Sequence, residues 1–273
     1  MIHSRRGGSE PVTTRFEHTY HDGTVAVHTR TTVLPAVPVE QNGSGAADRR
    51  TEVFDTFGRV VWAADERGYI THHRYDPATG ARTRTIRDYQ TAGASSSSSS
   101  TAGFDPAAVP EGWQTPAGGG RHLVTDYEVD ALGRTTQSLG PVHKDHLGRD
   151  VRTARWTVYK NPTHEVWTAQ GYTIPEVDGD GYEYVLVNPV SIQITDDEAG
   201  TVDSVQAIRP STVGRLNPAT DSFPQSTWCR WSRTISDAAG RTVASRVYHT
   251  IPPEEQGEGH EGTHYDQTRF GHD

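Results

Sequence analysis

Apolar and polar residues alternate along much of this chain with the period of two that is typical of a half-buried β-strand. The segment TVAVHTRTTV at 24–33 alternates in this way, and so does RHLVTDYEVD at 121–130. Between 155 and 195, short aromatic and β-branched runs are separated by turn dipeptides such as Asn161-Pro162, a pattern that predicts an antiparallel meander. No segment keeps a helical period for ten residues, so the sequence predicts an all-β protein.

One turn pattern, Asp-x-x-Gly-Arg, recurs along the chain. It occurs four times, where residue usage alone would give about 0.2 matches. Relaxed copies without the Arg lie at Asp65–Gly68 and Asp197–Gly200. An Asp that opens such a turn accepts hydrogen bonds from the backbone that follows, the Gly supplies a left-handed conformation, and the Arg begins the return strand. The expected turn residues are Asp55, Gly58, Arg59, Asp130, Gly133, Arg134, Asp145, Gly148, Arg149, Asp237, Gly240 and Arg241.

The segment FDTFGRVVWAADERGYITHHRYD at 54–76 resembles the Rhs/YD-repeat family, whose units carry Tyr-Asp-x-x-Gly-Arg turns. Diverged copies are YEVDALGRTTQSLGPVHKDHLGRDVRTARWTVY, SRTISDAAGRTVASRVY and the terminal HYDQTRFG, and the matches cover roughly two fifths of the chain. The resemblance implies antiparallel hairpins that join edge to edge into part of a spiralling β-sheet shell. Aromatic residues would then fill the sheet face, namely Phe54, Tyr75, Tyr127, Tyr248 and Tyr265.

The resemblance also implies a large secreted or cell-surface parent protein in which neighbouring repeats are the chief partners, because one repeat cannot satisfy its own strand edges. The terminal HYDQTRFG stops inside its turn, so we expect a piece of a longer protein. The sequence contains no Asp-Pro-x-Gly segment of the kind that ends the shell in toxin-bearing members. Neither self-cleavage nor a toxin is therefore assigned.

Turn and composition signals divide the chain into four expected segments. They are an N-terminal β segment and loop at 1–50, repeats at 51–90, a Ser/Gly/Pro-rich linker or loop at 91–120, and diverged repeats at 121–273. A β-meander insertion at about 160–230 interrupts the last segment.

Composition excludes several classes of function. A net charge of -9 argues against nucleic acid as the main partner. No run reaches the roughly 18 apolar residues of a membrane span. The first residues, MIHSRRGGSEPVTTRF, lack the apolar region of a signal peptide, so we expect any export signal to lie elsewhere. Apolar residues make up 33% of the chain, which favours a thin, partly hydrated β structure over a thick core.

The clearest enzymatic pattern is His260-Glu261-Gly262-Thr263-His264, which matches the zinc signature His-Glu-x-x-His. Zinc chemistry of this kind needs a helix that places both His residues on one metal. Gly257, Gly259 and Gly262 make a helix unfavourable here. We therefore expect no metal, no cofactor and no catalytic residue, and a metal-dependent hydrolase is the least favoured function.

A carbohydrate- or surface-binding β module is the main alternative to a structural repeat segment. Exposed tryptophans can stack on sugar rings, so glycans are candidate partners in this reading. The candidate residues are Trp156, Trp167, Trp228 and Trp231. The competing interpretation places the same rings in the core of the sheet.

Overall fold

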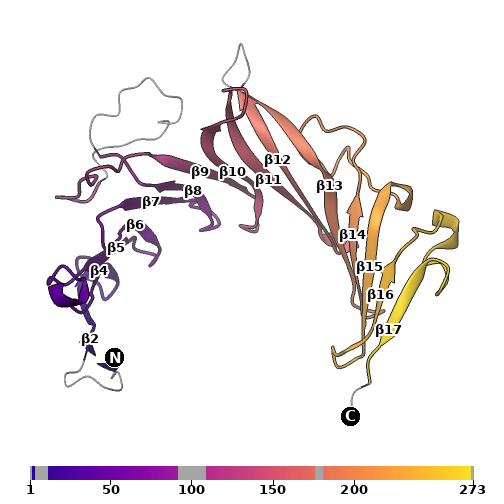
Figure 1. Ribbon diagram of the computed structural model, residues 1–273, viewed down its shortest axis with the longest axis horizontal. Helices are drawn as coiled ribbons and strands as arrows, with labels where there is room; N and C mark the ends of the chain where they lie inside the picture. The colour runs from indigo at the N-terminus through magenta and orange to yellow at the C-terminus, as the bar shows by residue number, and fades with distance from the viewer. Residues whose placement is uncertain (1, 4–11, 92–108, 176–180, 272–273) are drawn as a thin grey trace. The chain divides into compact units, whose positions relative to one another are not determined.

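The computed structural model describes residues 2–3, 12–91, 109–175 and 181–271, and it is built from β-strands (Figure 1). The described ranges contain no α-helix, only short 3-10 turns such as Val39–Gln41 (η1) and Asn161–Thr163 (η4). The all-β prediction is therefore confirmed. The chain forms two compact units, Met1–Asp126 and Tyr127–Asp273.

The first unit holds a two-stranded sheet and the first strands of a long antiparallel sheet. The bounds are β1 Ile2–His3, β2 Val12–Thr13, β3 Arg15–Tyr20, β4 Val27–Val33, β5 Arg49–Phe54, β6 Val60–Ala64, β7 Ile70–Tyr75 and β8 Arg82–Arg87. Strand β9, Leu123–Val129, contains the division between the units.

The second unit continues with longer strands. They are β10 Thr135–Lys144, β11 Asp150–Lys160, β12 Glu165–Pro175, β13 Tyr182–Asp196, β14 Thr201–Ala207, β15 Trp228–Ser236, β16 Thr242–Tyr248 and β17 Tyr265–Arg269. Further 3-10 turns lie at Gln225–Thr227 (η5) and Glu254–Gln256 (η6).

Strands β3 to β17 follow one another in the sheet in chain order, fifteen strands in all. The register pairs are antiparallel throughout, as in β11–β12, where Arg152 pairs with Thr173 and Lys160 with Glu165. Local hairpins therefore build the sheet, because each strand pairs with the one before it and the one after it.

Each unit has its own hydrophobic core on one side of its strands. In the first unit the core contains Val53, Trp62, Ile70, Ile86, Tyr89 and Val124. In the second unit a larger core includes Trp156, Trp167, Leu186, Val205 and Trp231. Alternation along β14 shows why the sequence folds this way, since Asp203, Val205 and Ala207 are buried while Ser204 and Gln206 between them are not.

The predicted Ser/Gly/Pro-rich segment at 91–120 lies mostly outside the described residues. Its described part, from 109, places Val109 and Trp113 against the core of the first unit. The hydroxyl of Thr115 donates to the backbone oxygen of Tyr89 at 2.9 Å, and the Thr115 backbone N–H donates to the Thr91 hydroxyl at 2.9 Å. These bonds join the end of the segment to the residues that follow β8.

Candidate functional site

The Asp-x-x-Gly-Arg turns form the first candidate site, and the turn at Asp55 shows their geometry. One carboxylate oxygen of Asp55, Oδ1, accepts from the backbone N–H groups of Phe57 at 3.0 Å and Arg59 at 2.9 Å. The other oxygen, Oδ2, accepts from Nε of Arg59 at 2.7 Å. Gly58 has φ 77°, a left-handed conformation in which most side chains are strained. One carboxylate thus holds the backbone of the turn and its arginine.

The three other copies repeat this arrangement. Oδ1 of Asp130, Asp145 and Asp237 accepts from the backbone of the residue two positions on at 2.9 Å in each turn. Their Oδ2 atoms accept from the Nε of Arg134, Arg149 and Arg241 at 2.8, 2.9 and 2.9 Å. The glycines at 133, 148 and 240 have φ of 77°, 76° and 76°.

The electrostatics of these carboxyls follow from the same bonds. Burial alone would raise the pKa of Asp55, but hydrogen bonds from the Arg59 and Phe57 backbones and from the Arg59 guanidinium outweigh it. The pKa of Asp55 therefore lies below its usual range. The pKa values of Asp130 and Asp145 are lowered in the same way, against the same opposing effect of burial. These acids are ionised structural groups rather than proton donors near neutral pH.

Two of the turn arginines also reach a neighbouring strand. The guanidinium of Arg59 lies over the ring of Tyr75 at 4.6 Å, and the Tyr75 hydroxyl donates to the backbone oxygen of Val60 at 2.8 Å. Arg134 lies over the ring of Tyr159 at 4.1 Å and donates to Asn161 at 2.8 Å. Stacking of arginine on tyrosine therefore connects a turn to a strand further along the sheet.

The relaxed copies differ from the full motif. In the turn at Asp65, Tyr69 occupies the arginine position, so its backbone N–H still donates to Asp65 at 2.8 Å but no guanidinium follows. The copy read at Asp197 is shifted by one residue. Asp196 is the residue whose carboxylate accepts from the backbones of Glu198 and Ala199.

Replacing Gly58 or Gly240 with Val should destabilise the protein by about 1–3 kcal/mol, because a β-branched residue is strained at positive φ. An added Cβ would have no atom within 4 Å at either position, so the loss is assigned to backbone conformation. Chemical denaturation measures the loss. Gly58→Asn is the matched control, because Asn tolerates this conformation, and it should lose clearly less. Unchanged stability in both Val variants would contradict the turn assignment.

The tryptophans proposed for sugar stacking lie mostly in the core. Trp156, Trp167 and Trp231 are each 2% exposed, and Trp228 is half-buried. The Trp231 ring is stacked on Tyr248 at a centroid distance of 3.7 Å, and the edge of Trp228 meets Trp231 at 5.0 Å. Three of the four rings thus have almost no free face, which does not suit stacking on a sugar.

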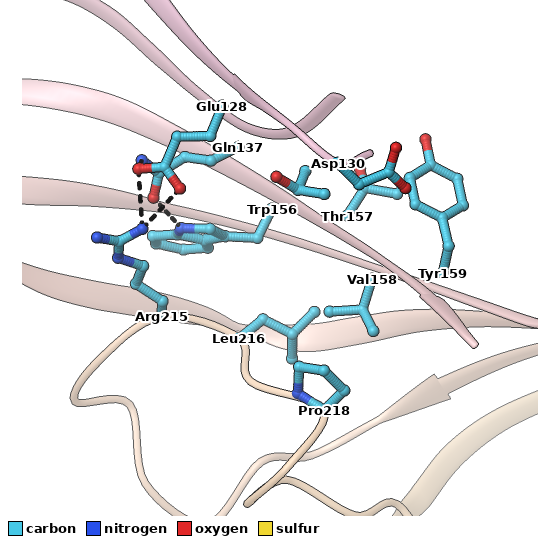
Figure 2. Close-up of a pocket in the computed structure, with 11 residues that line it drawn as sticks. Glu128, Asp130, Gln137, Trp156, Thr157, Val158, Tyr159, Arg215, Leu216 and Pro218 are labelled. Atoms are coloured by element: carbon cyan, nitrogen blue, oxygen red, sulfur yellow. Dashed lines mark hydrogen bonds and ion pairs between the residues drawn. The ribbon is translucent and has the colours of Figure 1, made fainter. Parts of the chain in front are cut away.

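A pocket of about 250 Å³ lies beside Trp156 in the second unit (Figure 2). The indole N–H of Trp156 donates to Gln137 Oε1 at 2.8 Å, and Gln137 Nε2 donates to Glu128 at 2.8 Å. Arg215 then pairs with both carboxylate oxygens of Glu128 at 2.9 and 2.8 Å. Apolar residues Val158, Leu216 and Pro218 line the other side. These polar groups bond to one another and so hold the loop that carries Arg215 in place. Few of their donors and acceptors are left to bind a ligand.

That loop contains residues that the sequence analysis missed. Arg209 donates to Asp221 at 2.9 Å and to the backbone oxygens of Val213 and Gly214. Leu216 inserts from the same loop into the core of the second unit. The sequence signal for this contact is an Arg and an Asp twelve residues apart, in a segment that also contains Pro and Gly. That spacing matches no known turn motif, so the contact was not predicted.

The zinc-like sequence at 260–264 does not form a helix. His264 is buried, and its Nδ1 accepts from the backbone N–H of His260 at 3.0 Å. Glu261 faces Arg269 at 3.6 Å. Within the described ranges, no group of three or more His, Cys, Asp or Glu residues is arranged to hold a metal ion. The same ranges contain no helix long and apolar enough to span a membrane.

One buried histidine, His72, stands out in the first unit. Its ring stacks on Trp62 at 4.0 Å, and its Nδ1 is buried without a hydrogen-bond partner. Burial, together with the smaller effect of the charges of Arg74, His73 and Arg84, lowers the pKa of His72 from 6.5 to about 4. The folded state therefore binds fewer protons than the unfolded state between these two values.

We expect the first unit to lose stability as the pH falls from about 6.5 towards 4, and to keep the full contribution of neutral His72 above that window. His72→Phe retains a ring against Trp62 and should flatten this dependence, as measured by urea denaturation at about pH 7.5 and about pH 5. The control His146→Asn, at an exposed turn, should follow the wild type. An unchanged pH slope in His72→Phe would contradict the assignment.

Comparison with known proteins adds weak similarities in fold. No family model and no curated protein matches the sequence. A protein of unknown function from Bacteroides fragilis NCTC 9343 is 10% identical, with a TM-score of 0.27 over 48% of this chain and 83% of that chain.

Chains from two further crystal structures are also similar. The match in TcdB2-TccC3-Cdc42 is 9% identical, with a TM-score of 0.25 over 86% of this chain. The match in TcdB2-TccC3 without the hypervariable C-terminal region is 10% identical, with a TM-score of 0.22 over 87% of this chain. This chain spans 14% and 16% of those two chains.

Proposed function

We propose that this chain is a structural repeat segment of a large secreted or cell-surface protein of the YD-repeat type. In this role it builds part of a β-shell and has no catalysis of its own. The secreted or surface location is part of the proposal and rests on the resemblance of the repeats.

The observation that carries the proposal is the repeated turn. Four turns use the same carboxylate to bind the backbone and an arginine, and each joins two strands that are neighbours in the sheet. Such a unit is completed by the strands on either side of it, which is the property expected of a repeat array. The carboxylates at these turns are fully engaged, which also supports a structural rather than a catalytic role.

Sequencing the coding DNA on both sides of this chain tests the proposal. We expect further Asp-x-x-Gly-Arg turns in the same reading frame, with an export signal upstream. A version of the protein extended by the flanking repeats should melt at a higher temperature, because each added repeat buries a strand edge. Flanking sequence without such turns, or an unchanged melting temperature, would contradict the proposal.

A further inference from the structure

A cavity of about 600 Å³ in the first unit brings three arginines together. Its lining includes Arg50 of β5, Arg87 of β8 and Arg121, which lies just before β9. Arg50 is near Glu52, with a distance of 3.5 Å between charged atoms. Arg87 and Arg121 are exposed and form no ion pair with any residue in the described ranges, whereas most arginines in those ranges pair with a carboxylate.

The backbone holds Arg87 and Arg121 close to each other. Asp88, which follows Arg87, accepts from the backbone N–H groups of Gly120 at 2.7 Å and Arg121 at 3.0 Å. The N–H of His122 donates to the backbone oxygen of Asp88 at 2.9 Å. These bonds hold the backbones of Arg87 and Arg121 near each other on one cavity, and they engage the carboxylate of Asp88.

The backbone at Asp88 and His122, which carries these bonds, is also strained. Asp88 and His122 have φ of 52° and 53°, in the left-handed region that residues other than glycine seldom adopt. Strained backbone of this kind clusters at binding sites, where the surrounding structure maintains it. Two positive side chains on one cavity repel each other, and an anion bound between them would relieve that repulsion.

Beside the apolar side chains of Ala63 and Leu123, the lining also contains polar groups. His72 of β7 pairs with Ile86 of β8. The same antiparallel register places Thr71 opposite Arg87. Tyr69 and Asp65 lie on the same cavity, and Asp65 opens the relaxed turn in which Tyr69 takes the position of the arginine. Hydroxyl and carboxylate groups of this kind can bind the hydroxyls of a polar ligand.

We propose that this cavity binds a small polar molecule through a phosphate or sulfate group. Guanidinium groups bind such oxyanions through two parallel hydrogen bonds, and three of them match the three terminal oxygens of an ester. The cavity is within the range of small-molecule sites and far larger than an inorganic anion, so the rest of the ligand faces Asp65, Tyr69 and Thr71. This site is separate from the structural role of the turns.

Calorimetric titration of the purified chain at low salt tests the site, with glucose 6-phosphate, glucose 6-sulfate, inorganic phosphate and glucose as probes. We expect saturable binding of the two esters, weaker binding of inorganic phosphate and none of glucose. The ester that binds more tightly identifies the anion. Arg87→Gln and Arg121→Gln should each weaken ester binding by about tenfold. The matched control Arg155→Gln removes an exposed arginine from β11 in the other unit and should leave binding unchanged.

Absence of saturable ester binding would overturn the proposal, and so would an equal loss in Arg155→Gln, since that would indicate attraction by net charge alone. Equal affinities for inorganic phosphate and the esters would contradict the proposal that the cavity also binds the organic part of the ligand. Melting temperatures of the variants, expected to equal that of the wild type because the side chains are exposed, show that the fold is retained. This outcome does not depend on the flanking sequence that tests the structural role.

Discussion

Asp203→Ala should destabilise the second unit by about 3–5 kcal/mol, because it removes this acceptor from the partly buried guanidinium of Arg233 and from the buried indole N–H of Trp231. Asp203 is 6% exposed. Its Oδ1 accepts from Trp231 Nε1 at 2.7 Å and Arg233 Nε at 2.7 Å, and its Oδ2 accepts from the Arg233 terminal nitrogen at 2.8 Å. The hydrogen bond to Asp203 also raises the pKa of Arg233 above its ordinary value, so the arginine stays charged.

Urea denaturation measures this loss. Asp266→Ala is the control, since Asp266 is exposed on β17 and its removal should change stability by less than about 0.5 kcal/mol. The double variant Asp203→Leu with Arg233→Met should be less destabilised than Asp203→Leu alone, because no buried charge is then left unpaired. A loss below about 1 kcal/mol in Asp203→Ala would show that Glu258, the second partner of Arg233, suffices.

Gly171→Ala should cost about 3 kcal/mol or more, or prevent folding. An added Cβ at this position would lie 2.1 Å from the backbone oxygen of Val185 and 2.7 Å from the ring of Trp156. Neither atom can move easily, since Val185 is in the neighbouring strand and Trp156 is in the core. The cost therefore comes from overpacking rather than from backbone conformation.

The matched control is Gly271→Ala, where no atom lies within 4 Å of an added Cβ. It should melt within a degree or so of the wild type. Thermal melting of the soluble variants, together with the soluble yield of Gly171→Ala, measures the difference. A melting temperature for Gly171→Ala close to that of Gly271→Ala would mean that β12 and β13 separate at little cost.

Local features of the fold could be predicted from the sequence. The all-β prediction, made from alternating residues and turn dipeptides, is confirmed. It could be made because strands and hairpin turns depend on residues only a few positions apart. The carboxylate of Asp55 accepts hydrogen bonds from residues two and four positions on, so the five-residue motif is enough to predict the turn. Every strand from β3 to β17 also pairs with its chain neighbours, which leaves little long-range topology to infer.

Contacts between distant residues could not be predicted in this way. Glu128 and Arg215 are 87 residues apart, and Asp203 and Arg233 are 30 apart. Nothing in the local pattern marks these partners. The tryptophans illustrate the same point, since the sequence allowed both an exposed and a core position, and only the register of the strands places Trp231 against Tyr248.

The turn at Asp55 pairs one acid with one base four residues later, and the same is true at Asp130, Asp145 and Asp237. Each copy of the motif therefore adds no net charge. Duplication or deletion of such a turn would leave the net charge from its Asp and Arg unchanged. The charge balance of the turn therefore depends on its own five residues and not on how many turns the sheet contains.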